Sequence, residues 1–200
     1  MVIKVEGITT KVKYYGIFDL KELYRMVRDK LVDEGYISEE KAKDNMMENY
    51  YSEKRSSDPR EAKTIWIWWR TKKKEEGSPF YEQRIDVDFH LRYIKDVEVL
   101  VDGDKKRVLQ GEVEVKLIGD LYIDPDDKWK NHWLLSSFLD FMVRRIWRKQ
   151  RESRKNSVIS DVMKIQAMVK EFFEIKHFMP LKPVEPFYPL YGYKIKGEQQ

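Results

Sequence analysis

The pentapeptide DVDFH contains the residue types that metal sites and acid–base chemistry use. In an extended strand alternate side chains point to the same face, so Asp86, Asp88 and His90 would lie together. Two carboxylates and an imidazole at this spacing could form a facial metal site. Arg84 and Arg92 continue the same row, however, and a row of alternating charges is typical of a solvated surface. We therefore favour a charge ladder here and expect no metal.

The rest of the chain contains no catalytic motif. It has no cysteine, which excludes disulfides, thiolate metal sites and cysteine nucleophiles. His132 and His177 are joined by no spacing such as HExxH, and no glycine-rich phosphate loop or GxSxG elbow is present. The 35 acidic residues leave a carboxylate pair for acid–base chemistry open. The sequence favours a protein without enzymatic activity or cofactor, and enzymatic activity stays open as an alternative.

The segment RRIWRKQRESRK, residues 144–155, is strongly basic. It has seven basic residues and one acid, so its net charge of +6 exceeds the +4 of the whole chain. Arginine forks fit phosphate groups, and we expect a footprint on a phosphate backbone. Two alternatives are a solvated helix end whose charges meet acids elsewhere, and an anionic membrane surface. The predicted nucleic-acid-binding residues are Arg144, Arg145, Arg148, Lys149, Arg151, Arg154 and Lys155, extended by Lys72, Lys73 and Lys74 at a strand end.

Three tryptophans lie in the segment TIWIWWR. In a strand Trp69 would share one face with two isoleucines, and Trp66 and Trp68 would share the other. We interpret Trp69 as a core residue and the other two as cross-strand packing on a sheet face. A stacking platform for bases and a wall of an apolar ligand pocket are the alternatives.

These residues need elements to position them, and the chain alternates between β-type and helical patterns. The β region has clean alternation and short turns, which predicts an antiparallel sheet in an α+β domain. Asp19 is a helix cap with an acid three residues later, and Gly35 is a helix stop. The predicted elements are a strand at 2–15, a helix from Asp19 to Gly35, a second helix at 38–54, a β region at 63–123, a long helix opening at Asp124 and running to 150, and a further helix at 158–175.

This order of elements over residues 2–150 resembles the helix-grip (START/Bet v 1-like) superfamily, in which a curved sheet wraps a long C-terminal helix. The resemblance implies a fold that often encloses an apolar cavity, and it carries over no functional residue. It supplies an alternative function, a carrier or enzyme that binds a small apolar ligand between the sheet and the long helix. We divide the chain into a helix-grip-like domain at 1–152, an accessory helix at 153–179 and a proline- and aromatic-rich arm at 180–200.

Two segments could contact a partner. Apolar residues at spacings of four and three form a short seam after the basic segment, and prolines at 180, 183, 186 and 189 predict an extended arm. Intramolecular packing, a homodimer and a partner helix are the interpretations that stay open. The predicted partner residues are Val158, Val162, Ile165, Val169 and Phe172 in the seam, and Phe187, Tyr188 and Tyr191 in the arm.

The composition limits the class of protein. Charged residues make up 37% of the chain, the pI is near 8.9, and no apolar run has the length of a signal peptide or a membrane span. We expect a cytoplasmic protein, and its Lys/Glu-rich composition suits a heat-adapted source. The function we favour is non-catalytic docking on RNA or a ribonucleoprotein, such as a ribosomal subunit, through the arginine-rich helix.

Overall fold

A computed structural model of the protein describes residues 3–38, 47–55, 62–75, 78–101, 104–129, 131–133, 138 and 141–175. The arm at 180–200 lies outside these residues, and so do its predicted partner residues Phe187, Tyr188 and Tyr191. His177 lies outside them as well.

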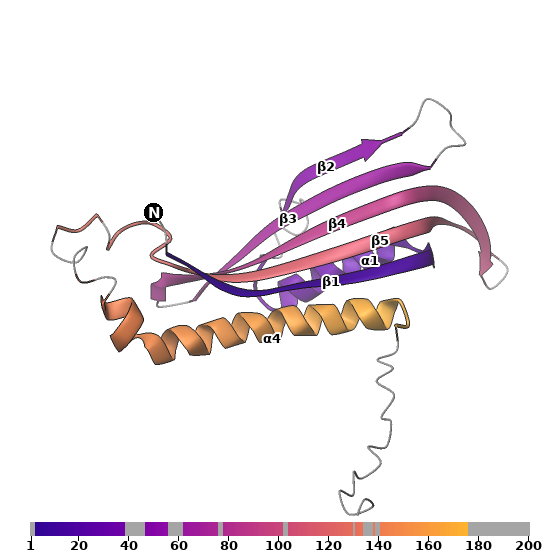
Figure 1. Ribbon diagram of the computed structural model, residues 1–200. Coiled ribbons are helices and arrows are strands. Elements are labelled where there is room, and N and C mark those ends of the chain that lie inside the picture. Colours follow the sequence, from indigo (N-terminus) through magenta and orange to yellow (C-terminus); the bar gives the residue numbers. More distant parts are fainter. Residues whose placement is uncertain are drawn as a thin grey trace, which may run out of the picture.

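The described strands form one antiparallel sheet of five, as the alternation predicts (Figure 1). Its order is β1-β5-β4-β3-β2, so the first of the described strands pairs with the last of them. The strands are β1 (Ile3–Phe18), β2 (Glu48–Lys54), β3 (Lys63–Glu75), β4 (Ser78–Val101) and β5 (Asp104–Ile123).

Helix α1, Leu20–Asp33, begins and ends where its capping residues predict. The Asp19 carboxylate accepts hydrogen bonds from the backbone N–H groups of Lys21 at 2.9 Å and Glu22 at 3.2 Å. Gly35 has a φ of +78°, a conformation that glycine adopts at little cost. Both predicted ends of this helix are confirmed.

The second predicted helix, 38–54, is wrong in its C-terminal part, and residues 39–46 lie outside the described ones. The segment Glu48–Lys54 is strand β2, which pairs with β3 so that Tyr50 lies opposite Trp68 and Tyr51 opposite Ile67. Pairing with a strand rich in tryptophan and isoleucine outweighs the weak helical pattern here, because aromatic residues pack well on a pleated surface.

The helix predicted to open at Asp124 is also wrong. Residues 124–129 form turns, in which Asp124 has a φ of +52° and its backbone N–H donates to the Phe80 carbonyl at 2.8 Å. Its carboxylate accepts from the Trp129 N–H at 3.0 Å. Asp124 therefore closes a turn against β4 instead of capping a helix.

The long helix occupies a different part of the chain from the predicted one. A short π-helix, η1 (Met142–Ile146), turns at Trp147 into α4 (Arg148–Phe172), and α4 is continuous for 25 residues. The break predicted at 151–157 is wrong, because arginine, lysine, glutamate and serine are all compatible with a helix interior and no Gly or Pro interrupts it. Helix α4 thus runs through the domain boundary predicted at 152.

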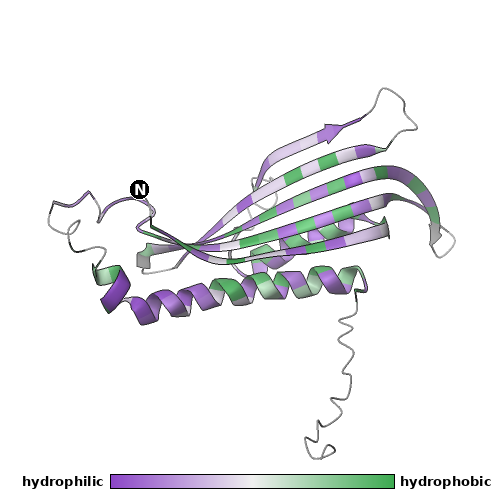
Figure 2. Ribbon diagram, in the orientation of Figure 1, coloured by the Kyte–Doolittle hydropathy of each residue, from purple (hydrophilic) through white to green (hydrophobic). Residues whose placement is uncertain are grey.

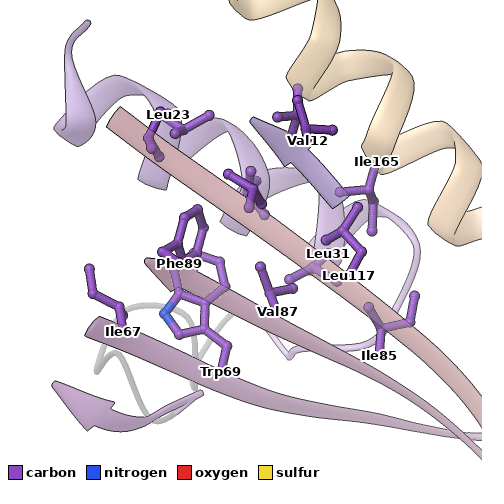
Figure 3. Packing of buried hydrophobic residues seen from close by; sticks show 14 of the residues in the cluster. Val12, Leu23, Leu31, Ile67, Trp69, Ile85, Val87, Phe89, Leu117 and Ile165 are labelled. Carbon is purple, nitrogen blue, oxygen red and sulfur yellow. The ribbon is translucent and has the colours of Figure 1, made fainter. Parts of the chain in front are cut away.

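Helices α1 and α4 cover the same face of the sheet, and the core lies between them and the strands (Figures 1 and 3). Trp69 and Phe89 are fully buried there, with ring centroids 5.0 Å apart, while Trp68 on the opposite face is 40% exposed. The predicted facing of β3 is confirmed. A second cluster, Tyr81, Leu121, Ile123 and Val143, joins the sheet to η1.

The apolar seam of α4 packs inside this core. Val158, Val162, Ile165 and Val169 are 0% exposed, and Phe172 is half-buried against the same cluster. The four fully buried side chains offer no surface to a second chain, which corrects the expected partner seam in favour of the intramolecular interpretation.

Candidate nucleic-acid interface

The basic segment lies where η1 passes into α4, and aromatic packing fixes it to the end of the sheet. Trp147 lies edge-on to Phe80 with centroids 5.0 Å apart and to Trp129 with centroids 5.2 Å apart, and Val143 is buried nearby. The Trp147 N–H donates to the Met142 carbonyl at 2.8 Å, which completes the π-helical turn. π-Helical turns are rare in proteins, and those that occur are often found at functional sites.

Four of the seven predicted phosphate-binding residues in the segment 144–155 are exposed. Arg144 and Arg145 lie on η1, Arg148 and Lys149 lie on the first turn of α4, and all four belong to the exposed class. The first buried residue of α4 is Val158, so none of the first ten residues of the helix is fully buried. The hydrophilic colour of this part of α4 in Figure 2 shows the same division.

The other three basic residues of the segment are half-buried. Arg151 donates to the Glu152 carboxylate at 2.9 Å. The guanidinium carbon of Arg154 lies 4.2 Å from the ring centroid of the buried Tyr81, and this cation–π contact attaches α4 to β4. Arg151 and Arg154 thus have structural contacts and are half-buried, whereas the side chains of Arg144, Arg145, Arg148 and Lys149 are exposed.

Two of the three lysines predicted to extend the basic segment form contacts within the chain. Lys73 donates to the Glu34 carbonyl at 2.7 Å. Lys74 lies 3.8 Å from the Glu82 carboxylate and 3.5 Å from that of Asp126. Lys72 is exposed.

Exposed aromatic side chains lie in the segment that leads into the basic one, and the sequence reasoning missed them. Trp133 is 82% exposed, Phe138 is 56% exposed, Phe141 is 52% exposed, and Ile146 between the arginines is 56% exposed. The sequence predicts this segment as part of the long helix at 124–150. The apolar residues directly before Arg144 and Arg145 are the feature of the sequence that could have indicated an exposed apolar surface beside the basic segment.

The row around DVDFH is a charge ladder, although its partners differ from the predicted ones. Arg70 on β3 donates to Asp88 at 2.6 Å and lies 3.6 Å from Asp86. His90 instead stacks on Trp66 with centroids 5.3 Å apart. Burial, with a contribution from the positive charge of Arg92, lowers the pKa of His90 below its usual value. Within the described ranges, no group of three His, Asp or Glu side chains is arranged to hold a metal ion.

The two predicted flanking cations bind elsewhere. Arg84 donates to Glu82 at 2.6 Å, and Arg92 donates to Glu112. Trp68 stacks on Tyr50 with centroids 4.4 Å apart, which agrees with cross-strand packing on this face.

Buried side chains of α4 pack against the sheet. Besides the valines and isoleucine of α4, the buried Asp161 carboxylate accepts hydrogen bonds from Tyr36 Oη at 3.0 Å and from Lys164 at 3.1 Å. Burial and the charge of Asp161 raise the pKa of Tyr36 far above its usual value, so the phenol stays a donor. Core residues therefore line the region where the helix-grip resemblance implies a cavity.

No protein-family model matches the chain, and no curated protein matches it. In the parts of the chain that the structure describes, none of the helices combines the length and the apolar character needed to cross a membrane.

Proposed function

We propose that the protein is a non-catalytic binding protein that docks on RNA or a ribonucleoprotein through the segment 144–149. The exposure of Arg144, Arg145, Arg148 and Lys149 on a fixed π-to-α junction is the observation that supports this proposal most directly. Four cations with outward side chains can contact successive phosphates without reading sequence.

The neighbouring aromatic residues add a second kind of contact. Exposed rings such as Trp133 and Phe141 can stack on unpaired bases, each stack contributing about 1–3 kcal/mol. A ribosomal subunit presents both phosphates and unpaired bases, and it is the ribonucleoprotein we propose as the first partner to test.

The architecture also fits a reduced helix-grip fold, which we propose as the superfamily. The first strand pairs with the last, two helices lie on one face, and the long helix follows the sheet in the chain. The buried side chains of α4 that pack on the sheet support a role of this fold as a rigid support for the basic segment.

The test compares two variants that lose the same charge at different places. In the first, Arg144, Arg145, Arg148 and Lys149 are replaced by Gln. In the control, four exposed lysines on β1 and β5 are replaced by Gln: Lys11, Lys13, Lys105 and Lys106.

Binding of a labelled RNA oligonucleotide is followed by fluorescence anisotropy over a series of salt concentrations. The slope of log K against log salt should shrink by about 0.7–0.9 for each lost phosphate contact, hence by about 3 in the first variant, and stay near the wild-type value in the control. Equal slopes in the wild type and the first variant would refute the proposed interface. Co-sedimentation with ribosomal subunits from native lysate, with and without nuclease, then tests the partner.

A further inference from the structure

A hollow of about 480 Å³ lies between the N-terminal half of α1 and the strands that face it. Its volume is within the range of about 300–1,000 Å³ that is usual for small-molecule sites. It lies beside Arg107 on β5, whereas the basic segment 144–149 lies beside Ile123 at the other end of the same strand. The two ends of β5 are up to about 50 Å apart at the rise of an extended strand, so the hollow is separate from the proposed RNA interface.

The helical wall of the hollow is basic. Lys21, Arg25 and Arg28 follow one another at i, i+4 and i+7 along α1, which places them on one side of the helix. Arg28 forms an ion pair with Asp29, with Nη2 and Oδ1 2.8 Å apart. Lys21 and Arg25 form no ion pair with any part of the chain that the structure describes. Arg107, whose side chain is 87% exposed and whose Nε lies 3.6 Å from the Glu98 carboxylate, adds a fourth cation from the opposite wall.

The two acidic side chains of the lining are already engaged. Asp19 caps α1. Glu48 accepts a hydrogen bond from Tyr24 Oη at 3.0 Å, and burial together with the charge of Glu48 raises the pKa of Tyr24 well above its usual value. Of the four cations that line the hollow, Arg28 and Arg107 have acidic partners just outside it, in Asp29 and Glu98. The excess of positive charge in the lining therefore comes from Lys21 and Arg25.

The floor of the hollow is apolar. Leu20 and Tyr24 from α1, Ile67 from β3 and Leu109 from β5 line it, and Tyr24 lies edge-on to the buried Trp69 with centroids 4.5 Å apart. A ligand that fits must therefore combine an apolar body with an anionic group.

From this lining we infer that the hollow is a binding site for a small amphipathic anion, such as a medium-chain or aromatic carboxylate. The apolar body would lie on Ile67, Leu20 and Leu109, and the carboxylate would accept hydrogen bonds from the Arg25 and Arg28 guanidinium groups. This site differs from the cavity along α4 that the helix-grip resemblance implies, both in its place and in the charge of its ligand.

The test uses 8-anilinonaphthalene-1-sulfonate, a fluorescent probe with an aromatic body and an anionic group. Decanoate and decanol, which share a chain and differ in charge, are compared as competitors. Decanoate should displace the probe at a lower concentration than decanol does. In the Arg25→Gln/Arg28→Gln variant the decanoate concentration needed should rise by about tenfold, the loss of one charge-assisted hydrogen bond, and that of decanol should not change.

A control variant, Lys11→Gln/Lys13→Gln on β1, removes the same charge outside the hollow and should behave as the wild type. If the α1 variant fails to fold by circular dichroism, Arg107→Gln on the exposed opposite wall should weaken displacement by decanoate in the same sense. Three results would overturn the inference: no saturable probe binding, equal displacement by decanoate and decanol, or displacement by decanoate that is unchanged in the variants of both walls.

Discussion

The packing of α4 on the sheet depends on Gly119, and a Gly119→Ala substitution tests this directly. A Cβ atom at position 119 would lie 2.6 Å from Cγ2 of Val162 and 2.9 Å from Cγ1 of Val158, and real Cβ atoms essentially never approach so closely. Both valines are fully buried, so neither can rotate into solvent. Inserting one methyl group into a packed core typically costs about 1–3 kcal/mol, and we expect the upper half of this range.

A second substitution separates this steric cause from a general preference for glycine. Val162→Ala removes the methyl group that would clash, and alone it should destabilise by about 2–3 kcal/mol through lost burial and the cavity left behind. The Gly119→Ala/Val162→Ala protein should be more stable than the sum of the two single effects predicts, with a coupling of about 1 kcal/mol or more.

Urea unfolding followed by far-UV circular dichroism measures these free energies, with a similar m-value in all variants as the sign that the states compared are the same. Ser160→Ala, at an exposed position of the same helix, is the control and should change stability by less than about 0.5 kcal/mol. A neutral Gly119→Ala, or strictly additive effects in the double variant, would refute the close approach of α4 to β5.

Three further predictions concern the sheet and the chain terminus. Trp69→Ala should destabilise by about 3–5 kcal/mol because Trp69 is fully buried, and Trp66→Ala should cost less in urea melts; the reverse order would contradict the facing of β3. Because the pKa of His90 is lowered in the folded protein, the unfolded chain binds the proton more readily, and stability should fall as the pH drops below the ordinary value of 6.5. His90→Phe keeps a ring against Trp66, and its stability should depend less on pH than that of the wild type. If the dependence of stability on pH is unchanged in this variant, His90 is not its cause. A homodimer stays a prediction. If the arm crosses between subunits, a chain that ends at Met179 should have a lower mass in light scattering and a lower Tm than the full chain. Equal mass and equal Tm would count against a crossing arm.

The sheet could be predicted from the sequence because its determinants are local. Alternation along β4 and β5 depends on period 2 alone, and the cap at Asp19 and the stop at Gly35 act within one turn of helix. The facing of Trp69 followed from the same period once β3 was identified.

The errors lie where tertiary contacts decide the structure. Glu48–Lys54 has enough helix-forming residues to suggest a helix, and only its pairing with β3 makes it a strand. Asp124 has the neighbours of a helix cap, but its hydrogen bond to Phe80, which is 44 residues away in the chain, fixes a turn instead. The hollow beside α1 escaped prediction because its lining comes from α1, β2, β3 and β5. The stripe of Lys21, Arg25 and Arg28 was visible in the sequence, but nothing there showed what it would face.

The pairing of β1 with β5 has a consequence for synthesis of the chain on the ribosome. Ile3 pairs with Ile123, so β1 has no partner strand until more than half of the chain has left the exit tunnel. An unpaired strand of this length is a template for aggregation, and Lys4, Lys11 and Lys13 on its exposed face are the kind of charged side chain that opposes this. Closing a loop of this length also makes the fold slow to form. The nascent protein should therefore complete its sheet late, with β1 kept available by its own charges until β5 emerges.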